Sequence, residues 1–128
     1  KTVEDIMIKG NKIPFVRENL RMSIALKILS EKKLGILVVR DKSKKTIGIV
    51  TDGNIRRVSQ KNSDFHNLLV KEIMTKKPVS VDKNELAAKA LSIMNNRKIT
   101  SLVVFEQKKP YITIGVVHVH TILQSNIS

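Results

Sequence analysis

The sequence contains no cysteine and no tryptophan, and aromatic residues make up only 3% of its 128 residues. Without cysteine, disulfide bonds, thiolate metal sites and cysteine nucleophiles are all excluded. The scarcity of aromatic rings leaves few platforms on which the bases of single-stranded nucleic acid could stack. No apolar run approaches the length of a membrane span, and the N-terminal KTVEDIMIKG lacks the regions of a signal peptide. We therefore expect a cytoplasmic protein without a membrane segment.

Acidic residues are also scarce, since 11 carboxylates stand against 24 lysines and arginines and the net charge is +13. Such an excess is typical of proteins that bind polyanions. The lysines are scattered singly and in pairs, however, so we interpret most of the charge as solvated surface and keep a nucleic-acid-binding domain as an alternative. The carboxylates are equally scattered, and no Ser-His-Asp grouping, carboxylate pair or phosphate-binding loop is present. We therefore expect no catalysis by this chain and no catalytic cofactor.

The chain consists of two copies of one pattern. A hydrophobic content of 41% is enough for a globular core. Three pairs of segments correspond in order along the sequence: VEDIM (3–7) with VKEIM (70–74), ALKILSEKKLGILVV (25–39) with ALSIMNNRKITSLVV (90–104), and IGIV (47–50) with IGVV (114–117). The spacing exceeds that of solenoid repeats, so the pattern indicates two half-domains rather than an array.

Each copy predicts the same local structure. A short helical turn precedes a brief extended segment, an amphipathic helix, two β-branched strands joined by a polar link, and a closing helix. The apolar helix faces are Ala25, Ile28 and Leu29 in the first copy, and Leu86, Ala90 and Met94 in the second. The expected strands are 36–40, 47–51, 101–105 and 111–117, and the closing helices begin near residues 52 and 119.

The predicted fold class is α+β, with two β-α-β-β-α halves, residues 1–62 and 63–128, related by a pseudo-two-fold axis. Neither half has enough apolar surface to stand alone. We therefore expect the halves to pack through their sheets with a cleft between them.

The motifs TDGNIRRV, RKITSLVV and GVVHVHTIL, placed in this tandem repeat, resemble a pair of cystathionine-β-synthase (CBS) domains. More narrowly, they resemble the C-terminal CBS pair of the sugar isomerases that make arabinose 5-phosphate for Kdo (3-deoxy-octulosonate) synthesis. This resemblance implies an N-terminal isomerase domain that is missing here, and the absence of an initiator methionine agrees with a fragment. It also implies a homodimer of CBS pairs.

The first strand–helix junction is the better candidate for a ligand site. Gly48 permits close approach to the strand, and Thr51 or Asp52 can cap the next helix, whose N-terminus favours phosphate. Arg57 lies in the first turns of that helix and suits phosphate contact. The resemblance implies that Asn54 occupies the position at which related CBS pairs carry a ribose-binding Asp. The alternative is that these residues only cap a helix.

The second junction carries different side chains. By the resemblance, Thr121 takes the ribose-Asp position, so neither copy has the family carboxylate. We expect His118 and His120 to alternate along the strand end and to meet a phosphate, because no third ligand for a metal is evident. Lys98, Thr100 and Ser101 lead into the strand where the family places ligand-facing residues, although such residues are equally typical of a strand-edge surface.

These observations favour a regulatory, ligand-sensing CBS pair of an arabinose-5-phosphate isomerase-type enzyme. It would bind an anionic nucleotide or nucleotide-sugar between its halves and signal to its own catalytic domain. The resemblance suggests AMP or ATP as ligands, or CMP-Kdo, the activated product further down the pathway. The second hypothesis is an assembly module of the same enzyme that dimerises and binds nothing, and the third is the nucleic-acid-binding domain.

Overall fold

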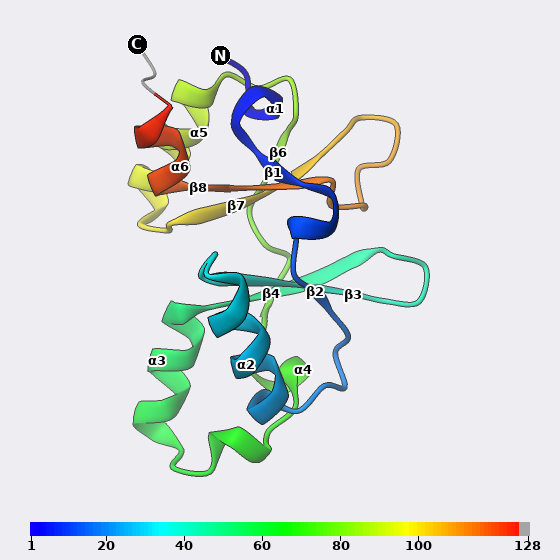
Figure 1. The fold of residues 1–128 in the computed structure, drawn as a ribbon, viewed down its shortest axis with the longest axis vertical. Coiled ribbons are helices and arrows are strands. Elements are labelled where there is room, and N and C mark those ends of the chain that lie inside the picture. The colour runs from blue at the N-terminus through cyan, green and yellow to red at the C-terminus, as the bar shows by residue number, and fades with distance from the viewer. Residues whose placement is uncertain (126–128) are drawn as a thin grey trace. The chain divides into compact units, whose positions relative to one another are not determined.

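The structure, a computed structural model, describes residues 1–125, which divide into two compact units. The central unit is Pro14–Pro78, and the terminal unit joins Lys1–Ile13 to the chain from Val79 onward. Each unit contains one four-stranded sheet together with its own helices (Figure 1). The same topology occurs in both, so each is described by itself below.

The helices and strands agree with the predicted order in both repeats, and the α+β fold class is confirmed. The central unit contains β2 (Phe15–Val16), α2 (Met22–Lys32), β3 (Ile36–Arg40), β4 (Thr46–Thr51), α3 (Asp52–Lys61), the 3-10 turn η2 (Phe65–Asn67), α4 (Val70–Ile73) and β5 (Thr75–Lys76). The terminal unit contains α1 (Val3–Ile6), β1 (Ile8–Lys9), the 3-10 turn η1 (Gly10–Lys12), β6 (Ser80–Asp82), α5 (Ala87–Arg97), β7 (Ser101–Phe105), β8 (Gly115–His118) and α6 (Val119–Gln124). No helix within residues 1–125 is long and apolar enough to cross a bilayer.

The two sequence repeats exchange the edge strands of their sheets. In the central sheet, ordered β2-β3-β4-β5, the first pair is parallel and the others are antiparallel. The terminal sheet, ordered β1-β8-β7-β6, follows the same rule, with β6 and β7 parallel. Thus β1 from the first repeat completes the sheet of the second, and β5 from the second repeat completes the sheet of the first. The sequence repeats, 1–62 and 63–128, therefore differ in their boundaries from the two units in space.

A glycine in each sheet makes this exchange possible. A Cβ atom at Gly48 of β4 would lie 2.7 Å from the Met74 sulfur and 2.9 Å from the Thr75 carbonyl oxygen. In the terminal sheet, a Cβ atom at Gly115 of β8 would clash with the Met7 sulfur in the same way. The close approach expected at Gly48 is therefore made by the chain itself. The repeated Ile-Met pair is the segment that packs onto the strand.

Each unit buries its own apolar core. In the central unit the core joins α2, β3 and β4 through Met22, Ala25, Leu29, Leu37, Val39 and Val50, among others. The corresponding core of the terminal unit includes Val3, Ala90, Met94, Leu102, Val104, Val117 and Ile122. Ala25 and Leu29, and likewise Ala90 and Met94, are buried on the predicted helix faces, while Ile28 is only partly buried.

Two local predictions were wrong. Leu86 precedes α5 as its N-cap residue, is 59% exposed and forms an isolated β-bridge with Thr2 instead of joining the helix's buried face. The strand expected at 111–117 begins only at Gly115, because the chain turns after β7 through a bridge between Glu106 and Lys109. Polar turns after short strands shift boundaries in this way, since a β-branched residue inside a turn looks like the start of a strand.

The short helix α1 is attached to the terminal unit by backbone and charge contacts. The Val3 N–H donates to the Glu85 carbonyl at 2.8 Å, and the Lys83 ammonium lies 3.6 Å from the Glu4 carboxylate and 3.5 Å from that of Glu106. The Glu4 charge, and then Glu106, raise the pKa of Lys83 above its usual value. Exposed pairs of this kind contribute little stability. Together with the backbone bonds they attach α1 to the turn between β6 and α5.

We predict that Gly48→Ala destabilises the chain by about 1–3 kcal/mol, the cost of overpacking a close contact. The added methyl group meets a backbone carbonyl as well as the Met74 side chain, so β5 must shift away from β4. The free energy of unfolding of the purified chain in urea measures this effect.

Gly53→Ala is the matched control for this substitution. A Cβ atom at Gly53 would approach the flexible end of the Arg57 side chain at 3.3 Å and Thr51 Oγ1 at 3.6 Å, which is an ordinary contact distance, and alanine has the higher helix propensity. Its stability should equal or slightly exceed that of the parent. Equal unfolding free energies for the two variants would contradict the role assigned to Gly48.

Candidate functional site

The first junction is a capped helix start. Thr51 ends β4 with an extended backbone and is the N-cap residue of α3, while Asp52 is the first helical residue. The Asn54 N–H donates to Thr51 Oγ1 at 3.4 Å, and the Thr51 N–H donates to Asn54 Oδ1 at 2.9 Å. This reciprocal pair is a capping box with Asn in place of the usual Glu. Capping by Thr51 is therefore confirmed. The negative charge of Asp52 interacts favourably with the positive end of the helix dipole at the N-terminus of α3.

Asn54 is buried and bonded within the central unit. Its Oδ1 accepts from both the N–H and the hydroxyl of Thr51, the latter at 2.8 Å, and its Nδ2 donates to the Ile73 carbonyl at 3.3 Å and to Thr75 Oγ1 at 2.9 Å. These four bonds use the two acceptor sites and both donors of the amide. The expected role in holding ribose stays a prediction, and it would require at least one of these bonds to break. A carboxylate would lack the donors that reach Ile73 and Thr75, which explains why an amide suits this position.

Arg57 lies over the first turn of α3. Its Nη1 atom is 3.3 Å from the point at which a Gly53 Cβ would stand, so the guanidinium group folds back toward the start of the helix. The residue is exposed, and among residues 1–125 no carboxylate approaches it within 4.0 Å. A free guanidinium group beside the N–H groups of a helix start is a favourable environment for phosphate.

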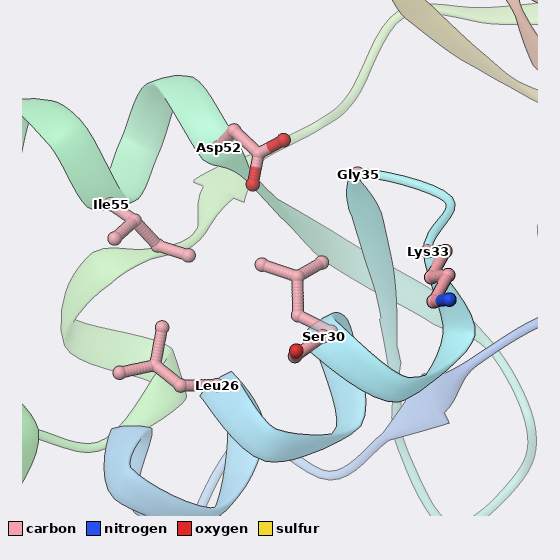
Figure 2. A pocket seen from close by; sticks show the side chains of 7 residues that line it. Leu26, Ser30, Lys33, Gly35, Asp52 and Ile55 are labelled. Atoms are coloured by element: carbon pink, nitrogen blue, oxygen red, sulfur yellow. The ribbon is translucent and has the colours of Figure 1, made fainter.

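A hollow opens in the central unit between the end of α2 and the start of α3 (Figure 2). It has a volume of about 390 Å³, within the range of small-molecule sites. The residues that line it are apolar on the helix faces and polar at the edge: Leu26, Leu29, Ser30, Lys33, Gly35, Asp52 and Ile55. Figure 2 shows Leu26 and Ile55 together on one side, Lys33 and Gly35 on the opposite side, and Asp52 entering from α3.

Among the ligand-site residues predicted from the sequence, only Asp52 lines this hollow; Leu29, predicted as part of the apolar face of α2, also lines it. Sequence reasoning missed Ser30, Lys33 and Gly35. The repeat itself contained the signal, because Lys33 and Gly35 correspond to Lys98 and Thr100, which were chosen in the second copy. The structure makes the correspondence concrete, since Lys33 and Lys98 both end their helices in the left-handed conformation, with φ of 57° and 56°.

The second junction gathers its predicted residues at one end of the terminal sheet. Ser101 begins β7 and pairs in register with His118, the last residue of β8. The Thr100 carbonyl accepts from the Val119 N–H at 2.8 Å, which attaches the start of α6 beside β7. Ser101 is 4% exposed, and its hydroxyl has no hydrogen-bond partner among the described residues. Lys98 and Thr100 are exposed.

The two histidines adopt a different arrangement from the expected alternation along a strand. His118 is the N-cap residue of α6, with Nδ1 accepting from the His120 N–H at 3.1 Å, and His120 lies inside the helix. Their rings nevertheless stack, with centroids 4.9 Å apart. Within the part of the chain that the structure describes, no group of three or more potential metal-ligating side chains comes together.

Thr121 does not reproduce the bonds of Asn54. It is half-buried in the first turn of α6, and no hydrogen bond joins its side chain to α1 or β1 among the described residues. The Asn54 amide therefore joins the first junction to the segment of α4 and β5 that lies against its sheet. The Thr121 side chain makes no corresponding bond to α1 or β1 among the described residues.

Comparison with known proteins places this geometry in a family. A model of the CBS domain matches residues 3–61 and again residues 70–127. Arabinose 5-phosphate isomerase KdsD of Yersinia pestis is 36% identical over 125 residues, which are 98% of this chain and 37% of that protein. Uncharacterized protein RP505 of Rickettsia prowazekii is 32% identical over 98% of the chain and 38% of its own length. The chain thus spans just over a third of these relatives.

Solved structures share the fold at low sequence identity. The CBS domain pair of protein MJ0100, in complex with 5′-methylthioadenosine and S-adenosyl-L-methionine, has a TM-score of 0.86 at 22% identity and covers 98% of this chain and 94% of its own. CBSX2 in complex with AMP has a TM-score of 0.81 at 23% identity, with 97% and 94% covered. Since the family model matches both repeats and the topology agrees with these solved folds, the chain belongs to the CBS domain family as a tandem pair.

Proposed function

We propose that this chain is the ligand-sensing regulatory module of an enzyme of the arabinose-5-phosphate isomerase type, and that its ligand is an adenosine nucleotide such as AMP or ATP. Its identity to KdsD relatives supports the first part, because the unmatched part of their length leaves room for a catalytic domain. The adenosine-based ligands of CBSX2 and protein MJ0100 support the second. CMP-Kdo has no counterpart among these neighbours and enters the test as a competing ligand.

The observation that carries this proposal is the hollow beside the start of α3. Its apolar surface, formed by Leu26, Leu29 and Ile55, offers a place for a base. The Arg57 guanidinium, folded back over Gly53, supplies charge next to the N–H groups of the first turn. A nucleotide placed with its base in the hollow and its phosphate at Gly53 would use both features within the central unit.

Regulation requires that the ligand prefer one conformation of the module over another. The Asn54 side chain ties the start of α3 to Ile73 and Thr75, so a ligand that tightens this helix start also acts on α4 and β5. A coupling of about 1–3 kcal/mol is the usual magnitude for such linkage. The catalytic domain would respond to the resulting shift in population.

We predict that AMP or ATP raises the melting temperature of the isolated chain. A ligand that binds only the native state stabilises it by about 2.7 kcal/mol at 100 times its Kd, which corresponds to a shift of several degrees for a chain of this size. Differential scanning fluorimetry with AMP, ATP, CMP-Kdo and GMP makes the measurement. A shift with CMP-Kdo alone would mean that CMP-Kdo, and not an adenosine nucleotide, is the ligand. No shift with any of the four compounds at millimolar concentration would favour an assembly role.

We also predict that Arg57→Ala weakens nucleotide binding by about 10- to 150-fold, the effect of losing one charge-assisted contact. Arg56→Ala is the matched control, because this arginine is also exposed and the substitution makes the same change in net charge. It should alter the Kd by less than about threefold, as should Thr121→Ala at the second junction. Isothermal titration calorimetry separates them, and equal affinities for all variants would mean that Arg57 is only a surface charge.

A second function, assembly, is favoured by exposed apolar side chains. Ile24 on α2 is 47% exposed and Leu123 on α6 is 61% exposed, although both side chains are large and apolar. Either side chain would lose its exposure to water if its helix packed against a second copy of the chain. They would suit the homodimer that the resemblance implies.

We therefore predict that the chain sediments as a dimer at micromolar concentration, and that Ile24→Lys or Leu123→Lys shifts it toward monomer by placing a charge in the apolar contact. Analytical ultracentrifugation gives the result. Lys27→Ala, a change at an exposed polar position of the same helix as Ile24, is the control. A monomer at high micromolar concentration would exclude this function.

A further inference from the structure

We infer that His118 is a pH-sensitive cap of α6, which holds the start of this helix while its imidazole is neutral and releases it when the ring takes up a proton. Acid then loosens the second junction and leaves the first intact. The inference concerns the conformation of the terminal unit, so it does not depend on which ligand the module binds. It rests on the different residues with which the two repeats cap the same helix.

The two repeats use different acceptors at the start of the closing helix. In the central unit Thr51 Oγ1 accepts from the Asn54 N–H at 3.4 Å, and a hydroxyl oxygen keeps its lone pairs throughout the physiological pH range. In the terminal unit the N-cap residue is His118, whose Nδ1 accepts from the His120 N–H at 3.1 Å. Only an imidazole nitrogen without a hydrogen can accept, so the neutral ring carries its hydrogen on Nε2. Protonation adds a hydrogen to Nδ1, and two donors then face each other.

The surroundings of His118 disfavour a charged ring. The His120 ring stacks on it with centroids 4.9 Å apart, so a second proton on the pair would meet the first at short range. The N–H groups in the first turn of α6 form the positive end of the helix dipole. Among the elements that pack against β8 and α6, the strand β7 carries no titratable side chain, α5 ends at Arg97 and is followed by Lys98, and β1 carries Lys9 (Figure 1). The charges that these three elements add near the second junction are therefore positive.

The carboxylates that could stabilise a charged imidazole gather at the other end of the terminal sheet. The strand β7 begins at Ser101, opposite His118, and runs away from the junction to Phe105. The side-chain carboxylates of this unit follow that far end or belong to segments bonded to it: Glu4, Asp5, Asp82, Glu85 and Glu106. Two of these carboxylates are already paired with Lys83 there.

The sign of the pH effect follows from proton linkage. A histidine in the unfolded chain takes up its proton near about pH 6.5. In the folded chain the same proton requires His118 to give up its bond to the start of α6. The unfolded state therefore binds more protons in this range, and the stability of the chain falls as the solution is acidified from about pH 7.5 to about pH 5.5.

The helix that is released connects the second junction to the N-terminal segment. At its start the Val119 N–H donates to the Thr100 carbonyl at 2.8 Å, and at its end the Ser125 carbonyl accepts from the Lys1 ammonium at 3.0 Å. Between them Ile122 is buried in the core of the terminal unit. A loosened α6 thus weakens contacts at both ends of this unit. Acid therefore makes the two repeats unequal in rigidity.

The test measures urea unfolding of the full purified chain at both ends of this pH range. For the parent we expect the equilibrium constant of unfolding to rise by about 2- to 30-fold on acidification, the effect of losing one N-cap bond. The chain has three histidines, so each can be replaced in turn. His118→Thr, which copies the cap of the first repeat, should remove most of the rise. His66→Gln and His120→Gln are the matched controls and should keep it.

Nuclear magnetic resonance of the parent gives a second readout, which needs no variant to fold. Long-range ¹H–¹⁵N spectra should show His118 Nδ1 without a hydrogen at neutral pH, with the His120 N–H protected from exchange. Both features should disappear together as the ring is protonated. A hydrogen on His118 Nδ1 at neutral pH would overturn the inference. So would a parent whose unfolding does not respond to acidification, or a rise of full size in His118→Thr.

Discussion

The contact between a strand glycine and a methionine-led edge segment is the constraint on which both units depend. Gly48 and Gly115 carry no side chain, so Met74 and Met7 can lie directly over β4 and β8. Each edge strand can then hydrogen-bond to a sheet that belongs to the other sequence repeat. Any side chain at these two positions would separate the strands that complete the sheets. Each sheet is therefore built from segments of both sequence repeats.

The start of α3 at the candidate site is held in place by the pairing of β5 with β4. Asn54 reaches Ile73 and Thr75 only because β5 lies against β4, and these bonds hold the first turn of α3 in place. Asp52 and Arg57 are thereby presented from a fixed helix start rather than from a loop. Binding groups on regular secondary structure lose less conformational entropy when they meet a ligand.

Much of the fold could be predicted from the sequence because its signals are local. The helix-then-strand pattern of 25–39 and 90–104 follows from periodicity over a few residues, and the structure confirms it. The strand expected at 111–117 was placed too early because β-branched residues in a turn resemble a strand start. The role of Asn54 could not be predicted at all, since its partners lie about twenty residues away and become neighbours only through β5. Local patterns do not contain such long-range pairings.

The pairing of β1 with β8 also determines when this chain can fold during synthesis. Ile8 leaves the ribosome well before its register partner Val116, because the whole central unit lies between them in the chain. The strand β1 must therefore remain unpaired while the residues between it and β8 are made, whereas the central unit can close earlier. Non-local pairings of this kind slow folding and leave strand edges exposed to wrong partners. A ribosome that stalls after the central unit but before Val116 would release a chain in which β1 has no partner strand and its edge is open to other chains.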